Sequence, residues 1–329
     1  MKTRYIKVNP LNFDINELEE AAKCIENGGL VALPTETVYG LGANTFDPNA
    51  VAKIYKAKGR PSDNPLISHI ADIDQVDLLA REVPENAKKL MEQYWGGPLT
   101  IILKRRDNVP GIVSANLDTV SIRMPSHPVA NALIKLSKTP IAAPSANLSG
   151  SPSPTTFEHC RMDMDGRVDF IIDGGNAAIG VESTVVDMTG DIPVILRPGA
   201  ITREDIINVC GDCIFGGEYA DAPKCPGMKY THYSPNAEVF AVNDIGSIEI
   251  PSGKNIAVIT YDRLKAYAKH ARFYSAGETD SEYAARLFYL LRKADEEGVE
   301  RVYASLPENS GIGIAVRNRL LKSAGGKVI

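Results

Sequence analysis

Residues 30–42 read LVALPTETVYGLG, in which an apolar run at 30–33 leads directly into a loop dense in hydroxyls and glycines. One predicted helix later, residues 56–66 read KAKGRPSDNPL and bring Lys58 and Arg60 close together. Hydroxyl groups and bare backbone N–H groups suit a small polar ligand, whereas Lys and Arg suit phosphate oxygens. A strand followed by such loops is typical of an α/β scaffold whose loops carry the function.

Apolar runs and amphipathic segments alternate through the first two hundred or so residues, which predicts a mixed α/β sheet. Asn16 followed by Glu19 indicates a capping box, and Asp47 before Pro48 is typical of a helix start. Thr189-Gly190-Asp191 lies between two apolar runs and predicts a hairpin of strands 185–188 and 194–196. The other predicted elements are strands at 30–33, 99–104, 120–124, 141–143 and 170–173, and helices at 48–57, 85–93 and 129–136.

The composition changes at residues 209–235. This segment is rich in glycine, proline and tyrosine and has no helical or strand period, so it predicts a linker. Beyond it, apolar strands at 256–260 and 302–305 and helical segments around Leu287 and at 311–323 predict a smaller α/β domain. We therefore expect a first domain at 1–208, a linker at 209–235 and a second domain at 236–329.

The bulk composition narrows the classes of function. The chain has 329 residues and a net charge of −5, so it has no general attraction for nucleic acid, and any phosphate site must be local. No apolar run is long enough to span a bilayer and no apolar leader begins the chain, so no membrane association and a cytoplasmic location are expected.

The five cysteines are scattered and odd in number, which argues against a disulfide framework. Cys210, Cys213, Cys225 and His232 could be read as a zinc site, but the second pair of ligands lacks a tight spacing. Reduced thiols and no metal site are the preferred interpretation.

The common catalytic motifs are absent from the sequence. It has no Walker loop, no His-Glu-x-x-His and no Gly-x-Ser-x-Gly, and Gly40 and Gly42 lack the third glycine of a dinucleotide fingerprint. What remains is a set of polar loops at the ends of predicted strands. Because ligands of open α/β sheets bind at strand ends, we expect these loops to converge on one pocket.

Several of these loops together resemble the L-threonylcarbamoyladenylate synthase family in its long, two-domain form. The resemblance covers residues 10–208, and residues 226–235 of the linker also match. It implies a YrdC-like twisted mixed sheet flanked by helices, followed by a smaller Rossmann-like α/β domain. The matching strings are residues 34–42, Lys58-Gly59-Arg60-Pro61, Ser145-Ala146-Asn147, Glu182-Ser183-Thr184-Val185 and Arg197-Pro198-Gly199.

The resemblance implies a nucleotidyltransferase of tRNA processing. L-threonine, bicarbonate or CO2, and ATP with Mg2+ would give threonylcarbamoyl-AMP and pyrophosphate. A separate tRNA threonylcarbamoyl transferase complex would use the product to make threonylcarbamoyladenosine, and a weak contact with RNA is also expected. Two anions, carbamate and triphosphate, must meet in this reaction, which explains a cluster of Lys and Arg in an acidic protein.

The family match also implies roles for individual residues, with Lys58 and Arg60 as the catalytic pair. Tyr233 would reach from the linker onto the nucleotide, which makes residues 209–235 a lid that excludes water, with Gly227 as a hinge. Glu36 and Glu182 are equally consistent with a role in proton transfer and a structural role. L-threonine is assigned to Thr37, His69, Arg123, Ala143 (through its backbone) and Ser183, and ATP to Arg60, Asn64, Thr119, Ser145, Asn147, Ser153, Arg197 and Tyr233.

Two other functions compete with this interpretation. A non-enzymatic binder of double-stranded RNA would use the same cationic pocket, but the acidic balance and the lack of a long basic stripe count against it. A carbamoyl-phosphate-using maturation enzyme shares the catalytic domain, but such proteins carry additional zinc-finger-like Cys clusters that this chain lacks. The second domain is compatible with a regulatory or partner-docking role in addition to the main reading.

Overall fold

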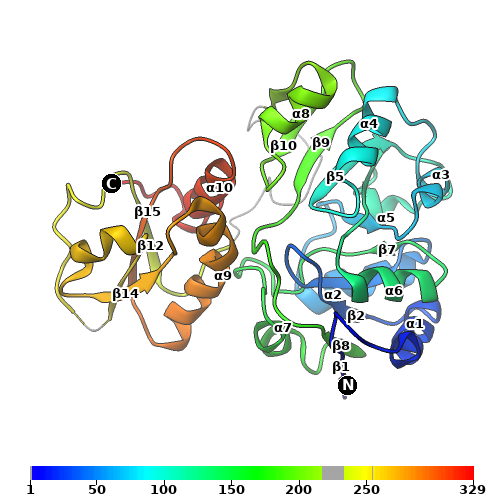
Figure 1. The fold of residues 1–329 in the computed structure, drawn as a ribbon. Helices are drawn as coiled ribbons and strands as arrows, with labels where there is room; N and C mark the ends of the chain where they lie inside the picture. Colours follow the sequence, from blue (N-terminus) through cyan, green and yellow to red (C-terminus); the bar gives the residue numbers. More distant parts are fainter. Residues whose placement is uncertain (1, 217–232, 254) are drawn as a thin grey trace.

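The computed structural model describes residues 2–216, 233–253 and 255–329, and it contains two β-sheets flanked by helices (Figure 1). The first sheet is mixed and 11-stranded, and the second is 4-stranded and parallel throughout. In Figure 1 the second sheet and its helices form a smaller lobe beside the first. The predicted fold class, a large mixed sheet with a smaller α/β domain, is therefore confirmed.

The large sheet places the chain's polar loops along its middle strands. β4 lies parallel to β6, with Ile67 opposite Ser121, and β5 lies parallel to β9, with Leu99 opposite Thr184. Across the sheet the order is β1 (Arg4–Lys7), β8 (Phe170–Asp173), β2 (Val31–Leu33), β3 (Gly40–Asn44), β7 (Ile141–Ala142), β4 (Ile67–His69), β6 (Thr119–Arg123), β5 (Leu99–Lys104), β9 (Thr184–Asp187), β10 (Val194–Arg197) and β11 (Ile214–Phe215).

Helices pack on both faces of this sheet through two separate apolar clusters. One cluster joins it to α1 and α6, and the other joins it to α2, α4, α7 and α8. The helices are α1 (Glu19–Glu26), α2 (Pro48–Lys58), α3 (Val76–Leu79), α4 (Glu85–Tyr94), α5 (Gly111–Ser114), α6 (Pro128–Leu136), α7 (Phe157–Met164) and α8 (Arg203–Cys210), with 3-10 turns η1 (Ile15–Leu18) and η2 (Ile73–Gln75).

Helix α2 shows how the sequence sets the position of a functional loop. The Asp47 carboxylate caps the helix by accepting from the N–H groups of Asn49 and Ala50, and Pro48 occupies the first turn. Gly59 ends the helix at φ 63°, a left-handed conformation that glycine adopts at low cost. The helix therefore ends at a fixed point, with Lys58 just before the turn and Arg60 just after it.

The second domain is a parallel sheet in the order β12 (Glu238–Val242), β15 (Arg301–Ser305), β13 (Ile256–Thr260) and β14 (Arg272–Ser275). Its helices are α9 (Asp280–Glu296), α10 (Gly313–Ser323) and the 3-10 helix η3 (Asp262–Ala268). Thr279 caps α9 through a capping box with Glu282. One face of α9 and α10 packs on the sheet in an apolar cluster that includes Phe288 and Leu320.

Most predicted elements are present, with differences at their ends. The first cap is Asp14 with Glu17, and not Asn16 with Glu19, because the chain enters its first helical turn two residues earlier. Part of the predicted glycine-rich loop is strand β3, which pairs antiparallel with β2. The hairpin of β9 and β10 is confirmed.

The first residues of the predicted linker belong to elements of the first lobe. Helix α8 continues to Cys210, and β11 pairs parallel with β10, with Val194 opposite Ile214. The predicted hinge, Gly227, lies outside the described residues. So do two residues of the zinc interpretation, Cys225 and His232. The division at 1–208, 209–235 and 236–329 stays a prediction.

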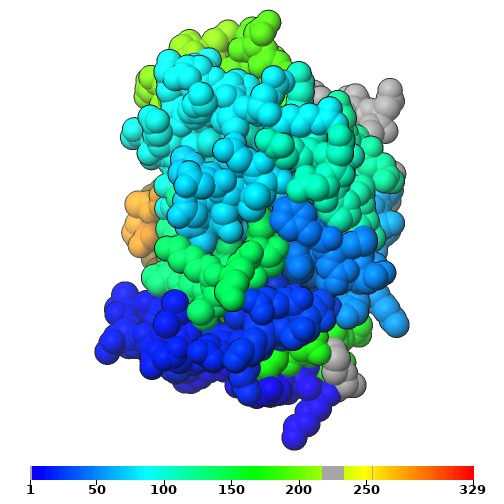
Figure 2. All heavy atoms as spheres, turned by 90° about the vertical axis from the view of Figure 1, so that its right-hand side faces the viewer, coloured from blue at the N-terminus to red at the C-terminus, as the bar shows by residue number. Residues whose placement is uncertain are grey.

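The two lobes share buried contacts. Val38 and Val181 from the first lobe join the same apolar cluster as Tyr283 and Phe288 of α9. Gly180, at φ 78°, lies so close to the backbone of α9 that a side chain there would collide with it. Figure 2 shows the side of the first lobe that faces away from the second lobe. N-terminal residues in blue lie below cyan residues there, and only an edge of the second lobe is visible.

The described segments include no helix with the length and apolar character that a membrane crossing requires.

Candidate active site

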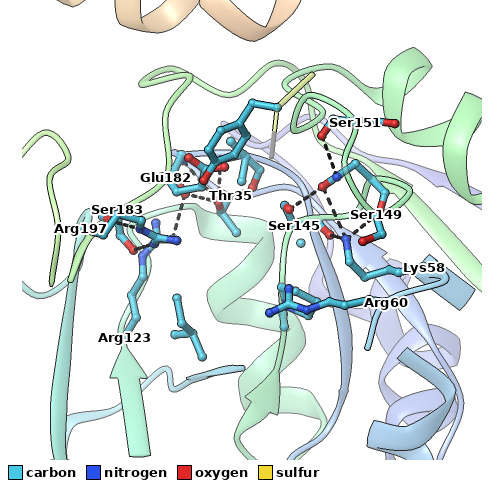
Figure 3. Close-up of a pocket in the computed structure, with 18 of the residues that line it drawn as sticks. Thr35, Lys58, Arg60, Arg123, Ser145, Ser149, Ser151, Glu182, Ser183 and Arg197 are labelled. Carbon is cyan, nitrogen blue, oxygen red and sulfur yellow. Dashed lines mark hydrogen bonds between the residues drawn. The ribbon is translucent and has the colours of Figure 1, made fainter. Parts of the chain in front are cut away.

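The predicted loops converge on one pocket in the first lobe, at its border with the second (Figure 3). Its described lining contains four cationic side chains and one carboxylate, Glu182, so it is a predominantly cationic pocket within an acidic protein. The lining residues are Thr35, Thr37, Val38, Gly40, Lys58, Arg60, Ile67, His69, Arg123, Ala143, Pro144, Ser145, Asn147, Ser149, Gly150, Ser151, Glu182, Ser183, Arg197 and Tyr233.

The cations form two pairs on opposite sides. Figure 3 shows Lys58 and Arg60 on one side and Arg123 and Arg197 on the other. Lys58 comes from the end of α2 and Arg60 from the turn after it, whereas Arg123 ends β6 and Arg197 ends β10. A ligand between the pairs meets positive charge from both sides.

Lys58 is held by backbone carbonyl groups. Its ammonium donates to the carbonyl of Ser145 and, at 2.6 Å, to that of Asn147. Burial and the neighbouring charge of Arg60 lower the pKa of Lys58. Among the described residues no carboxylate forms an ion pair with Lys58, and the partners of its ammonium are oxygens of Ser145 and Asn147.

Arg60 lies beside unpartnered polar atoms. Its Nη2 donates to the carbonyls of Asn64 and Pro65 at 3.2 and 3.3 Å. Within the described residues, the Arg60 Nε and both side-chain polar atoms of Asn64 are buried with no hydrogen-bond partner. Buried polar atoms are almost always paired in folded proteins, so this region is suited to a polar ligand.

Arg123 forms a buried ion pair with a residue to which the sequence assigned no single role. Its Nη2 donates to the Glu36 carboxylate at 2.6 Å, and its Nη1 donates to the Thr37 hydroxyl at 2.8 Å. Burial favours the neutral acid, but the charge of Arg123 outweighs it and lowers the pKa of Glu36. The positive charge of Arg123 is thus largely balanced, unlike that of Lys58.

His69 is neutral in this environment. Burial and the nearby charge of Arg123 lower its pKa to about 3, and its Nδ1 lies 3.2 Å from the Ile67 carbonyl. The ring offers a hydrogen bond and a shape, and not a charge, to a ligand.

Ser183 and Arg197 are joined at the same wall. The Arg197 guanidinium donates to the Ser183 carbonyl and hydroxyl, both at 3.0 Å, and that hydroxyl lies 2.7 Å from the hydroxyl of Thr100. This arrangement fixes the orientation of both side chains relative to Arg123 in Figure 3.

Tyr233 reaches the pocket from the far end of the predicted linker. It is 6% exposed, its ring stacks on Phe288 of α9 with centroids 5.1 Å apart, and the next residue, Ser234, donates its N–H to the Gly150 carbonyl at 2.9 Å. The end of the linker is therefore packed between the pocket and the second lobe.

Three of the predicted site residues are not among the described lining. Asn64 lies next to Arg60. The pairing of β4 with β6 places Thr119 at the same end of the sheet as Asn64. Ser153 is buried behind the wall and donates to Glu182 at 2.6 Å. The other predicted residues all line the pocket, namely Lys58, Arg60, Thr37, His69, Arg123, Ala143, Ser183, Ser145, Asn147, Arg197 and Tyr233.

Sequence reasoning missed two residues of the second lobe that contact the pocket walls. Arg319 of α10 pairs with Glu182, and Arg292 of α9 donates to the Pro152 carbonyl. Neither lies in a motif, so no local signal marked them. Among the described residues no group of three or more His, Cys, Asp or Glu side chains is arranged to hold a metal ion.

Comparisons with known proteins agree with this geometry. A family model of Sua5, YciO and YrdC proteins, described as telomere recombination, matches residues 23–199. A second model, described as the C-terminal domain of threonylcarbamoyl-AMP synthase, matches residues 201–325.

Similar proteins span nearly the whole chain. The threonylcarbamoyl-AMP synthase of Pyrococcus abyssi is 47% identical over 324 residues, which cover 94% of both chains. That of Bacillus subtilis is 47% identical over 331 residues, covering 95% of this chain and 94% of the other. The crystal structure of P. abyssi Sua5 complexed with L-threonine has a TM-score of 0.91 at 44% identity and covers 99% of both chains.

These comparisons support the synthase interpretation and not the RNA-binding alternative. The chain belongs to the threonylcarbamoyl-AMP synthase family and is an enzyme, an ATP-using nucleotidyltransferase of threonylcarbamoyladenosine biosynthesis on tRNA.

Proposed function

We propose that the pocket binds L-threonine between Arg123 and Ser183 and the triphosphate of ATP against Lys58 and Arg60, so that the two meet between the cation pairs. The observation that carries this proposal is the difference in charge between the two sides. Lys58 forms no ion pair within the described residues, whereas Arg123 already has the Glu36 carboxylate.

The Arg123 side is suited to an amino acid. L-threonine carries one carboxylate, and an arginine that is partly neutralised binds a single negative charge without a large excess of positive charge. Thr37 and neutral His69 supply hydrogen-bonding groups, and the Ala143 backbone borders the same space. The structure of the P. abyssi relative with L-threonine supports this choice of ligand.

The Lys58 side is suited to a nucleotide. Its cations line the pocket, and Arg60 lies beside the unpartnered side chain of Asn64. ATP would lie along Arg60, Asn64 and Thr119, with Ser145, Asn147 and Ser153 on the neighbouring loop. Arg197 and Tyr233 would contact it from the opposite wall.

The reaction follows from these positions. The neutral amino group of threonine attacks CO2 with release of a proton, or bicarbonate with release of water, to give a carbamate. A carbamate oxygen then attacks the α-phosphorus, and the bond to the bridging oxygen breaks to release pyrophosphate. Lys58, Arg60 and Arg197 would stabilise the charge that develops in this step, while positioning supplies the rest.

Mg2+ would enter with the triphosphate and balance its charge. The only carboxylate of the described lining is Glu182, and both its oxygens have partners, so the pocket offers no free carboxylate for a metal. Magnesium commonly keeps several waters and binds through substrate phosphates, which is compatible with such a pocket.

The product would then pass to a tRNA threonylcarbamoyl transferase complex in the cytoplasm, with at most weak contact between this protein and RNA. Tyr233 lines the pocket and stacks on Phe288, which supports its proposed contact with the nucleotide, whereas most of the predicted lid, residues 217–232, lies outside the described residues.

The experiment that tests the reaction measures pyrophosphate release from ATP and Mg2+, with threonine and bicarbonate omitted in turn. We expect release to depend on both. Release without either, or no release, would contradict the proposed reaction, and salt-dependent RNA binding would then be measured.

A further inference from the structure

Two arginines of the second lobe are buried against the walls of the pocket in the first. Arg319 of α10 has no exposed surface and Arg292 of α9 is 7% exposed. Arginine is rarely buried unless its charge is paired, so both must be held by specific contacts.

Arg319 joins two segments of the first lobe with one guanidinium. Its Nε donates to the Glu182 carboxylate at 3.0 Å, and its Nη2 lies 3.4 Å from the Glu182 carbonyl. Its Nη1 donates to the Pro198 carbonyl at 2.9 Å and to the side chain of its neighbour Asn318 at 3.0 Å. Because Ser183 follows Glu182 and Arg197 precedes Pro198, Arg319 fixes the backbone next to two residues of the pocket.

Glu182 carries this contact to Ser153, which follows the loop that holds Ser149 and Ser151 on the Lys58 side of the pocket. Its second oxygen accepts from the Ser153 hydroxyl at 2.6 Å, so a continuous chain of polar contacts runs from Arg319 through Glu182 to Ser153. Burial favours the neutral acid, but the charges of Arg319 and Arg197 lower the pKa of Glu182, which therefore stays ionised.

Arg292 holds the loop on that other side. Its Nη2 donates to the Pro152 carbonyl and to the Asp163 carboxylate, each at 2.6 Å. The same carboxylate accepts from the Leu148 N–H at 3.2 Å. The loop from Leu148 to Pro152 follows Asn147, whose carbonyl accepts from Lys58.

We propose that Arg319 is a positioning residue of the active site, through which the second lobe holds Glu182, Ser183 and Arg197 in place. The planar fork of arginine reaches a carboxylate and a carbonyl at once, which a lysine ammonium at this site cannot match. The role of the second lobe is thus to complete the pocket wall. This proposal rests on the proposed function above, in which the substrates of the pocket are L-threonine and ATP.

The test compares R319A with R317A on the same helix. Arg317 donates to the Pro307 carbonyl within the second lobe and, among the described residues, forms no hydrogen bond or ion pair with the first, so R317A should keep wild-type kinetics. Displacing reacting groups by about 1 Å can cost on the order of 100-fold, so R319A should lower kcat/KM for pyrophosphate release about tenfold or more. The KM for threonine or ATP should rise, and R319K should recover part of the loss.

E182Q removes the charge that Arg319 contacts but keeps the shape of the side chain. It therefore tests the same contact if R319A does not fold. It should raise the same KM as R319A, and the double variant should be no worse than either single variant. A variant whose kcat falls with its folded fraction while both KM values stay at wild type would show a purely structural role and overturn the proposal.

Amide hydrogen exchange without substrates provides a measurement that is independent of activity. Exchange at residues 182–199 should be faster in R319A than in R317A, and unchanged exchange there would contradict the proposal. If the wild type released no pyrophosphate, the proposed function would fail, whereas this exchange measurement would still decide the role of Arg319.

Discussion

The two cationic sides of the pocket differ in how their charges are balanced. Arg123 is paired with a buried carboxylate, whereas Lys58 and Arg60 are held by carbonyl groups and form no ion pair among the described residues. Carbonyl dipoles orient a cation without cancelling its charge. The unbalanced side is therefore suited to a polyphosphate and the balanced side to the single carboxylate of an amino acid.

The largest effect is expected from removing a cation of the unbalanced side. Arg60→Ala should lower kcat/KM for pyrophosphate release at least about tenfold, because a single charge-stabilising group commonly contributes that much or more. Lys56→Ala, which removes an exposed lysine of α2, the helix that ends just before Arg60, is the matched control. Steady-state kinetics at saturating threonine would measure this loss. A near-normal rate in R60A would contradict the difference proposed between the two sides of the pocket.

Arg197→Ala should also lower activity about tenfold, since Arg197 both carries charge and orients Ser183. The measurement is pyrophosphate release as a function of each substrate. If only the charge matters, R197K should restore most of the rate; if orientation matters too, as we expect, R197K should restore little.

A smaller effect on activity, but a clear one on stability, is expected for Glu36→Gln. Removing one charge of a buried ion pair commonly costs about 3–5 kcal/mol, so thermal or urea unfolding should show a less stable protein. Glu20→Gln disrupts an exposed pair with Arg4 and should unfold like the wild type. If E36Q and E20Q were equally stable, the ion pair between Arg123 and Glu36 would make no measurable contribution to the stability of the fold.

The last effect concerns the pH dependence of stability, to which His69 contributes. Its pKa is about 3 in the folded protein, below the ordinary value near 6.5, so the unfolded chain binds the proton more readily. The stabilisation is present above about pH 6.5 and declines as the pH falls toward 3. H69Q should therefore lose less stability than the wild type between pH 6.5 and 4 in urea titrations.

The sequence predicted those parts of the fold that depend on local pattern. The segment Leu99–Lys104 (LTIILK) is mostly apolar and its predicted bounds match those of β5, and Asp47 with Pro48 marks the start of α2. The three-residue strand Ile67–His69 was missed, because it is too short to show a period and depends on its neighbours in the sheet.

The same limit applies to the site. Thr37, Lys58 and Arg197 lie in motifs, so the sequence brought them to attention, and the structure places them in one pocket. The contact between Glu182 and Arg319 joins residues 137 positions apart. In the sequence, an arginine on an amphipathic helix looks like any solvent-facing residue, and only tertiary packing shows that Arg319 is buried.

One measurement addresses the division of the pocket most directly: calorimetric titration of L-threonine, without ATP, into R123A and R60A. We predict that R123A binds threonine at least about tenfold more weakly than the wild type, through loss of a charge-assisted contact, whereas R60A binds it as the wild type does. Weak threonine binding by R60A together with normal binding by R123A would contradict the account.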